Sequence, residues 1–274
     1  MQLHEVEGGG GLRLHVREWG NDRGSAIFLI HGWSQNHMCW SHQYGSRLAD
    51  EFRLVALDNR GHGMSEKPLG AEHYNDERLW ADDVAAVISA LDLERPVLVG
   101  WSYGGYIICD YVRIHGEGAI AGINYVCAAV MLNDAYDNIG SGFLENAPDA
   151  TSEDLPTSIA GMRRFLRACT ADPLDEEDFE SALCYNMVVP PQVRRALATR
   201  RIDSDEVLSG LTVPTLVTHG EEDTVVLPSM ARHVLDACPT AEASWYEGVG
   251  HAPFIEDPER FNRELADFAR RATS

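Results

Sequence analysis

A serine between glycines, at the junction of a strand and a helix, is the feature that most constrains this chain. Residues 100–105 read Gly-Trp-Ser-Tyr-Gly-Gly after the apolar run Pro-Val-Leu-Val, and a helical pattern begins at Tyr106. In this context Gly-x-Ser-x-Gly is typical of a sharp turn that exposes the serine hydroxyl. The N-terminus of the following helix also favours negative charge. We therefore predict that Ser102 is a nucleophile, against the alternative of an incidental serine in a glycine-rich turn.

Strand-like and helix-like runs alternate along most of the sequence. Several strand-like runs are continuously apolar, as expected for parallel strands that are buried on both faces. The predicted strands are Leu12–Glu18, Ala26–Ile30, Arg53–Leu57, Pro96–Val99, Ile123–Leu132, Thr215–His219 and Ala243–Tyr246. The predicted helices are Asp76–Leu91, Tyr106–His115, Pro228–Ala237 and Pro258–Arg271. This order predicts an α/β fold with a mostly parallel central sheet and helices on both faces.

The alternation breaks between residues 134 and 210, where helical patterns cover Ser158–Thr170, Asp175–Val188 and Pro191–Arg201. We predict that residues 134–210 form a helical cap, or lid, over the strand ends. Residues 1–133 and 211–274 are then the core. Apolar side chains of the cap either line a pocket or fill the interior of the cap itself, and both uses stay open for Phe143, Phe165, Leu166, Tyr185 and Met187.

A serine hydroxyl is a weak nucleophile without a base. His251 follows the last predicted strand in Gly-Val-Gly-His-Ala-Pro, where small neighbours leave it accessible. The base needs an orienting carboxylate, and Asp223 comes shortly after the strand that ends at His219. We predict His251 as the base and Asp223 as its partner, and interpret His219 as structural. Glu221, Glu222 and Asp134 are further candidates for the carboxylate.

Two backbone N–H groups are predicted to stabilise the oxyanion of an acyl transfer. The first belongs to Trp33, which follows a strand in Ile-His-Gly-Trp, and the second to Tyr103, the residue after the predicted nucleophile. Trp33 also has the size of a core residue, and both uses are compatible because the reaction needs only its backbone. The predicted site is therefore Ser102, Asp223 and His251 with the Trp33 and Tyr103 amides.

These motifs resemble those of the α/β-hydrolase fold superfamily. The resemblance is carried by His31-Gly-Trp, Asp58-Asn-Arg-Gly-His-Gly-Met-Ser65, Gly100-Trp-Ser-Tyr-Gly104, and Gly220-Glu-Glu-Asp with Gly250-His-Ala-Pro. The order nucleophile, acid, base is also that of the superfamily. Within it the chain is similar to small-capped esterases grouped with cofactor-free haloperoxidases (perhydrolases) and to acyl-homoserine lactonases. The Asp58–Ser65 segment resembles a structural loop of that group, and we assign it no catalytic role.

The resemblance implies a serine hydrolase that cleaves carboxylic esters or lactones through an acyl-enzyme on Ser102, with no metal and no cofactor. The same residues suit a perhydrolase that uses hydrogen peroxide in place of water. Other members of the fold cleave carbon–carbon bonds, for which an extra histidine such as His37 would be a hint, or act as small-molecule receptors with slow turnover. A dehalogenase or epoxide hydrolase needs a carboxylate nucleophile, and the serine at position 102 argues against both.

The formal net charge of −21 argues against nucleic acid and anionic membranes as partners, because both would repel the chain. No apolar stretch approaches the ~20 residues that span a bilayer, and the N-terminus lacks the apolar core of a secretion signal. The six cysteines form no Cys-x-x-Cys pair, which predicts a reduced, cytoplasmic protein with buried thiols.

Seven arginines concentrate positive charge in the predicted cap of this acidic chain. We expect them to form a solvated face that balances nearby carboxylates. The alternatives are that they attract an anionic substrate or the acidic surface of a second subunit, which would give a homodimer. These residues are Arg163, Arg164, Arg167, Arg194, Arg195, Arg200 and Arg201.

Overall fold

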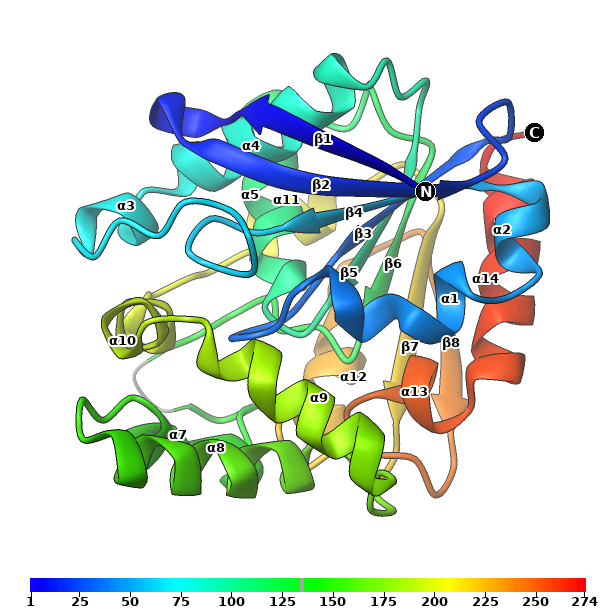
Figure 1. Ribbon diagram of the computed structural model, residues 1–274. Helices are drawn as coiled ribbons and strands as arrows, with labels where there is room; N and C mark the ends of the chain where they lie inside the picture. Colours follow the sequence, from blue (N-terminus) through cyan, green and yellow to red (C-terminus); the bar gives the residue numbers. More distant parts are fainter. Residues whose placement is uncertain (134–135) are drawn as a thin grey trace.

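An eight-stranded sheet runs through the centre of the structure, a computed structural model that describes residues 1–133 and 136–274 (Figure 1). Its strands are β1 (Gln2–Glu7), β2 (Arg13–Gly20), β3 (Ala26–Ile30), β4 (Arg53–Asp58), β5 (Val97–Trp101), β6 (Gly122–Val126), β7 (Thr215–Gly220) and β8 (Ala241–Tyr246). They lie in the order β1-β2-β4-β3-β5-β6-β7-β8. β2 is antiparallel to both β1 and β4, and the remaining pairs are parallel. The predicted mostly parallel sheet is confirmed.

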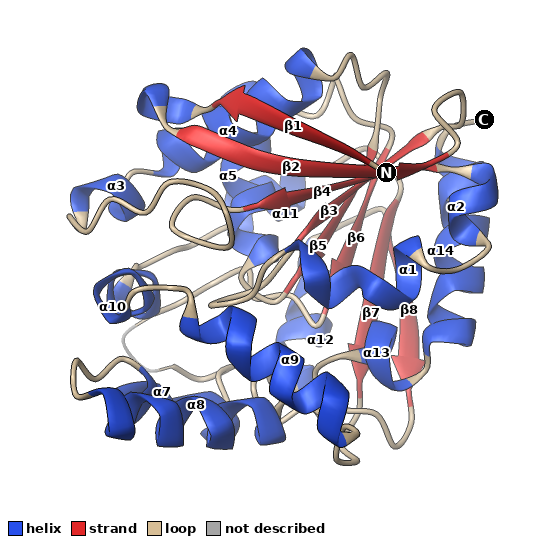
Figure 2. Ribbon diagram, in the orientation of Figure 1, coloured by secondary structure: helices blue, strands red, loops and turns tan. Residues whose placement is uncertain are grey.

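Helices cover both faces of this sheet (Figure 2). Because successive strand residues point to opposite faces, the neighbours Ile27 and Phe28 of β3 belong to two different apolar cores. The core with Phe28 is covered by α4 and α5, and the core with Ile27 by α14. The helical elements of this part of the chain are η1 (Gly9–Gly11), η2 (His37–Trp40), α1 (Ser41–Tyr44), α2 (Leu48–Glu51), α3 (Glu72–Asn75), α4 (Glu77–Ala90), α5 (Gly104–His115), α12 (Pro228–Ala237), α13 (Pro253–Glu256) and α14 (Pro258–Ala272).

The C-terminal helix shows why the helical predictions lie close to the observed bounds. In α14, Phe261, Leu265 and Phe268 are buried and recur at spacings of four and three residues, which is the period of one helix face. Asp257 accepts a hydrogen bond from the Arg260 amide and caps the first turn, and a proline at the first helical position favours the same start. The predicted range 258–271 differs from the observed helix by one residue.

The structure differs from the predicted strands at two places, one where a predicted strand is too long and one where a strand is not predicted. The predicted strand Ile123–Leu132 is wrong in its second half, because β6 ends at Val126 and Cys127 takes a positive φ of 41°. The apolar residues that follow are buried in a loop, and an apolar run alone does not distinguish a buried loop from a strand. Strand β1 was missed because only Val6 is buried in this polar edge strand.

A set of helices separates β6 from β7 in the sequence. We call these the inserted helices: α6 (Ser141–Leu144), α7 (Ala147–Ala150), α8 (Leu155–Ala168), α9 (Glu176–Met187), α10 (Pro191–Thr199) and α11 (Asp205–Gly210). Those labelled α7, α8 and α9 lie beneath the ends of the central strands, whereas α11 lies beside α5 (Figure 1). A backbone hydrogen bond of 2.8 Å from Leu132 N to Ile202 O joins the start of the insertion to the segment between α10 and α11. The division into a core and a cap remains a prediction. Asp134, one candidate for the catalytic carboxylate, lies outside the described residues.

The arginines of the insertion do not all form a solvated face. Arg163 and Arg164 pair with carboxylates at the surface, as expected. Arg194 and Arg200 are instead buried, with only 1% and 5% of their surface exposed. Arg200 pairs with the buried Asp110 of α5 at 2.7 Å, so it ties the end of α10 to the helix that follows Ser102. The expectation of a solvated face fails for these two arginines because sequence spacing does not show which side of a helix is buried.

The cysteines are free thiols, and all but Cys184 are buried. Within residues 1–133 and 136–274, the structure contains no helix with the length and apolar character needed to cross a membrane.

Candidate active site

Ser102 occupies a strained turn between β5 and α5. Its φ is +54°, a left-handed conformation that costs an ordinary residue about 1–2 kcal/mol. Three backbone hydrogen bonds hold it there: Ser102 N donates to Val126 O at 3.0 Å, and the amides of Gly105 and Ala129 donate to Ser102 O at 2.9 and 3.0 Å. Strain that the surrounding backbone maintains in this way is typical of functional positions.

The glycines beside Ser102 are required by close packing. A Cβ on Gly104 would lie 2.4 Å from Ile30 O, and a Cβ on Gly105 would lie 2.6 Å from Ala129 O. On the other side of the serine, a Cβ on Gly100 would lie 2.6 Å from Ile108 Cδ1. These distances agree with the predicted role of the glycines in admitting the sharp turn.

Gly104→Ala is expected to destabilise the protein, because its new methyl group meets backbone that cannot move without disturbing β3. Forced overpacking of this kind costs about 2 kcal/mol or more, or roughly 5 °C in the thermal midpoint. The matched control is Gly210→Ala in α11, where an added Cβ meets nothing within 4 Å. Equal midpoints for the two variants, measured by differential scanning calorimetry, would show that the turn is not closely packed.

Asp223 and His251 form a buried pair at the ends of two neighbouring strands. His251 Nδ1 lies 2.7 Å from Asp223 Oδ2, while Asp223 Oδ1 accepts the amides of Val225 and Val226 at 2.8 and 3.0 Å. Asp223 is 3% exposed and His251 is 1% exposed. An imidazole that donates from Nδ1 to this carboxylate carries its lone pair on Nε2 when the ring is neutral.

The second ring nitrogen of His251 is available for chemistry. Nε2 is buried and has no hydrogen-bond partner in the part of the chain that the structure describes, Ser102 Oγ included. His251 nevertheless lies beside the turn, because the ring of Trp101, the residue before Ser102, is 5.6 Å from its imidazole. Trp101 Nε1 also donates to His251 O at 2.8 Å. Hydrogen bonds between a catalytic serine and histidine are often long before a substrate binds.

A second histidine reaches the carboxylate of Asp223. His219 Nε2 lies 2.9 Å from Val226 O and 3.3 Å from Asp223 Oδ2, and the ring is 1% exposed. Burial lowers the pKa of His219, so the ring is neutral and does not compete as a charge. The sequence interpretation of His219 as structural did not include this contact. In the sequence, the spacing of four residues between His219 and Asp223 is the one feature that could have indicated this contact.

The predicted oxyanion donors are the backbone amides of Trp33, in the segment after β3, and of Tyr103, in the turn that contains Ser102. Neither amide has a hydrogen-bond partner among the described residues. The Trp33 segment approaches the serine closely, since a Cβ on Gly32 would lie 2.9 Å from Ser102 Cβ. The Trp33 indole donates to Arg194 O of α10 at 2.9 Å, which fixes this segment against the inserted helices. Both amides are thus free to bind an oxygen.

Two buried histidines hold the segment that contains Trp33. His31 Nδ1 lies 2.8 Å from Gly32 O and its Nε2 accepts the Asn59 amide at 3.0 Å. His62 Nδ1 lies 2.8 Å from Arg60 O and its Nε2 accepts the Ser34 amide at 3.2 Å. Each ring therefore donates from Nδ1, accepts at Nε2 and must be neutral. Burial lowers the pKa to about 4 for His31 and to about 3 for His62.

These two histidines predict a loss of stability in acid. The unfolded chain protonates histidine near pH 6.5, whereas the folded chain holds His31 and His62 neutral to about pH 4 and about pH 3. The unfolded state therefore binds more protons in this window, and stability is full above pH 6.5 and falls as the pH drops. Each histidine should cost roughly 2–3 kcal/mol of unfolding free energy by pH 4.5.

Urea unfolding of wild type and His62→Asn between pH 8 and pH 4.5 tests this expectation. Asparagine keeps an acceptor at this position but does not titrate, so the stability difference between the two proteins should shrink as the pH falls. A difference that does not change with pH would contradict the neutral, buried state of His62.

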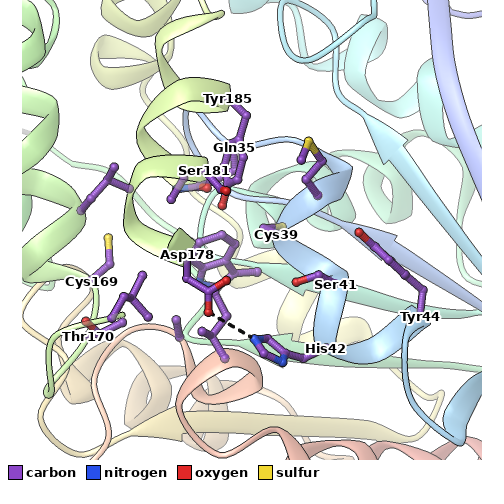
Figure 3. Close-up of a pocket in the computed structure, with 17 residues that line it drawn as sticks. Gln35, Cys39, Ser41, His42, Tyr44, Cys169, Thr170, Asp178, Ser181 and Tyr185 are labelled. Atoms are coloured by element: carbon purple, nitrogen blue, oxygen red, sulfur yellow. Dashed lines mark ion pairs between the residues drawn. The ribbon is translucent and has the colours of Figure 1, made fainter. Parts of the chain in front are cut away.

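Two cavities lie between the inserted helices and the sheet. The serine cavity, of about 40 Å³, is lined by Ser102 and mainly by apolar side chains that include Trp33, Tyr103, Leu132, Phe143 and Phe165. The α9 cavity, of about 160 Å³, is lined by residues that include Gln35, Trp101, Leu166, Ser181 and Tyr185 (Figure 3). Four of the apolar residues singled out in the sequence thus line a cavity: Phe143, Phe165, Leu166 and Tyr185. Met187 instead contacts Arg194.

His37, the histidine that would hint at carbon–carbon bond cleavage, does not reach these cavities. Its Nδ1 lies 2.8 Å from Asp58 Oδ1, and its backbone N–H donates to the same oxygen at 2.8 Å. Glu221 and Glu222, the two glutamates that precede Asp223, are exposed and so lie apart from the buried pair.

The mostly parallel sheet, the strained serine turn at the end of β5 and the Asp223–His251 pair define an enzyme of the α/β-hydrolase fold class. A model of the Alpha/beta hydrolase family matches residues 27–264, and the chain belongs to that family. The resemblance inferred from the motifs is confirmed.

Relatives in this family include enzymes of two kinds. The chain is 28% identical over 269 residues to non-heme chloroperoxidase CPO-A1 of Kitasatospora aureofaciens, covering 94% of this chain and 96% of that protein. It is 27% identical over 274 residues to bifunctional esterase/perhydrolase DCH of Acinetobacter calcoaceticus, covering 95% and 97%. The crystal structure of esterase RhEst1 from Rhodococcus sp. ECU1013 is 38% identical with a TM-score of 0.93, covering 98% of this chain and 99% of that one.

Proposed function

We propose that this protein is a serine hydrolase of carboxylic esters that works through an acyl-enzyme on Ser102. The observation that carries the proposal is the Asp223–His251 pair, which leaves the Nε2 of His251 without a hydrogen-bond partner among the described residues, beside the strained serine turn. The esterase RhEst1, at 38% identity, and the esterase/perhydrolase of Acinetobacter calcoaceticus support the same reaction class. A hydroxyl next to an oriented imidazole is the arrangement that acyl transfer requires.

In the first step, Ser102 Oγ attacks the carbonyl carbon of the ester while His251 Nε2 takes the hydroxyl proton. The carbonyl oxygen gains negative charge and is held by the free amides of Trp33 and Tyr103. The tetrahedral intermediate then expels the alcohol oxygen, which receives the proton from His251 as the carbon–oxygen bond breaks. Asp223 keeps the proton on Nδ1 and stabilises the imidazolium that forms between these events.

In the second step, water repeats the same sequence on the acyl-enzyme. His251 removes a proton from the water, the hydroxide attacks the acyl carbon, and the returning proton releases Ser102 and a carboxylic acid. The groups assigned here belong to one chain, so the chemistry does not depend on the homodimer that the sequence leaves open. The same steps open a lactone, whose alcohol stays attached to the acid product.

The inserted helices are proposed to form a cap that selects the substrate. Phe143 and Phe165 from this segment line the serine cavity. With room for roughly three water-sized groups in about 40 Å³, this cavity suits a short acyl chain. A small, mostly apolar cavity around a nucleophile favours short aliphatic acyl groups over long or charged ones. We place the enzyme in the cytoplasm, where its free cysteines stay reduced.

A profile of p-nitrophenyl esters of increasing acyl length tests this proposal. We expect kcat/KM to peak at acetate to butyrate and to fall at least about tenfold by octanoate, because longer chains exceed the serine cavity. Matched reactions with Ser102→Ala should show no release above the buffer rate. Equal release by wild type and Ser102→Ala would contradict the nucleophile, whereas a peak at octanoate would contradict only the short acyl site.

Perhydrolysis is the second candidate, favoured by the names of the relatives. One relative is a bifunctional esterase/perhydrolase and another a non-heme chloroperoxidase. Hydrogen peroxide attacks the acyl-enzyme in place of water and gives a peracid, with the proton again passing through His251. Peracid formed per ester consumed, measured over a range of peroxide concentrations, separates the two. A ratio that stays at zero assigns hydrolysis alone.

A further inference from the structure

Residues that are neighbours in the chain line the α9 cavity and the serine cavity. Consecutive residues of β5 and its turn, Trp101 and Ser102, line the α9 cavity and the serine cavity respectively. In α8, Leu166 and Phe165 are divided between the two cavities in the same way. The two cavities are therefore lined by consecutive residues at two places along the chain, one of which includes the nucleophile, although no residue lines both. The proposed mechanism assigns no use to the larger one.

The walls of the α9 cavity include the residues that hold His251 in place. Trp101 Nε1 donates to His251 O at 2.8 Å, and the His251 amide donates to Cys169 O at 2.9 Å. Ala252 follows His251 directly. Trp101, Cys169 and Ala252 line the α9 cavity. The serine cavity, by contrast, is lined by Trp33 and Tyr103, whose amides are the proposed oxyanion donors.

The chemistry requires different neighbours for the two halves of an ester. The alcohol oxygen must lie within hydrogen-bond distance of the general acid, because it receives the proton from His251 as it leaves. The acyl carbon stays on Ser102 with its oxygen at the Trp33 and Tyr103 amides. We infer that the α9 cavity is the binding site for the alcohol part of the ester, and that the serine cavity holds the acyl part. This inference rests on the proposed function.

The size and lining of the α9 cavity define the class of alcohol. At about 160 Å³ it is four times as large as the serine cavity, at about 40 Å³. Its walls combine rings and aliphatic groups with uncharged polar side chains, among them Gln35, Ser181 and Tyr185 (Figure 3). Substrates are therefore esters of short acids with neutral aromatic or branched alcohols, the reverse of a lipid-like ester with a long acid and a small alcohol.

Two exposed lining residues of the α9 cavity join the inserted helices to the core. Asp178 of α9 faces His42 of α1, with 4.0 Å between Asp178 Oδ2 and His42 Nε2 (Figure 3). Both side chains are more than a third exposed, so the pair contributes little to stability. Asp178 is an exposed carboxylate in the lining of the α9 cavity, and the chain carries a net charge of −21. Both disfavour anionic alcohols, which agrees with a neutral leaving group.

Two cavity-filling variants test the assignment. Ser181→Phe narrows the α9 cavity and Ala198→Phe narrows the serine cavity, in which Ala198 is a lining residue. Each variant and the wild type are assayed with acetates of ethanol, phenol and 2-naphthol, and with phenyl esters from acetate to hexanoate. The measured quantity is kcat/KM, which reports the acylation step in which the alcohol is still present.

We expect Ser181→Phe to lower kcat/KM for naphthyl acetate at least tenfold while changing ethyl acetate less than twofold, with an unaltered preference for acyl length. Ala198→Phe should do the opposite: it shortens the preferred acyl chain and leaves the order of alcohols unchanged. If Ser181→Phe fails to fold, Tyr185→Ala, which enlarges the α9 cavity, should raise the naphthyl-to-ethyl ratio at least threefold.

The inference is overturned if Ser181→Phe or Tyr185→Ala shifts the acyl preference, or if neither changes the ratio between alcohols. Failure of the proposed function has a different signature, because the wild type would then show no Ser102-dependent turnover of any ester in the set.

Discussion

Ser102→Ala is expected to lower kcat/KM for a short-chain ester by about 10⁴-fold or more and to leave the fold intact. Loss of the nucleophile removes the acyl-enzyme route, and only binding and the oxyanion donors remain. The hydroxyl makes no side-chain hydrogen bond among the described residues, while the backbone amides of Gly105 and Ala129 hold the turn. Alanine also takes the same backbone conformation at the same strain. The thermal midpoint should therefore stay within about 2 °C of wild type.

Ser102→Gly separates strain from chemistry at the same position. Glycine adopts the +54° φ of Ser102 without the penalty of about 1–2 kcal/mol that a side chain adds. This variant should be as inactive as Ser102→Ala but more stable by about 1 kcal/mol, or roughly 2–4 °C in midpoint. Calorimetry of the three proteins provides the comparison. A glycine variant that melts below the alanine variant would show that the turn stores no strain.

Asp223→Asn is the second large effect, with an expected loss in kcat on the order of 10⁴-fold. The two amides that donate to Asp223 Oδ1 require an oxygen there, so the asparagine must turn its NH₂ group towards His251. That group donates to Nδ1 and forces the imidazole proton onto Nε2, where a lone pair is needed to accept the Ser102 proton. KM should change less than about threefold, since Asp223 lines neither of the two cavities.

Glu222→Gln is the matched control for Asp223→Asn. Glu222 is exposed and directly precedes Asp223 in the chain, so its amide variant should keep kcat within twofold of wild type. A large loss in Glu222→Gln with a small loss in Asp223→Asn would show that Glu222, and not Asp223, orients His251. Steady-state kinetics with a p-nitrophenyl ester gives both values.

The sequence predicts those features of the site that local backbone geometry dictates. The strained turn at Ser102 needs glycines on both sides, so a five-residue pattern predicts it, and the ends of parallel strands place Asp223 and His251 at one edge of the sheet. The fold class follows from the alternation of strands and helices for the same reason. These features depend on residues that are near one another in the chain or on the rules of parallel sheets.

Features that depend on packing between distant segments were not predictable in this way. Arg194 and Arg200 have the charge of solvated residues, but Arg194 is buried against Ser158 of α8 and Arg200 against Asp110 of α5. The contact of His219 with Asp223 depends on how the loop after β7 folds back. The α9 cavity arises where α9 meets η2 and α1, more than a hundred residues apart in the sequence, and no local pattern reports such a space.

The most direct test of the central claim is to find the acyl group on Ser102 during turnover. Wild type mixed with p-nitrophenyl acetate is quenched in acid within the first turnover, digested, and analysed by mass spectrometry. We predict that the peptide containing Ser102 gains the mass of one acetyl group, and that Ser102→Ala gains none. Turnover at the normal rate with no acetyl on Ser102, or with acetyl on another residue, would contradict the account.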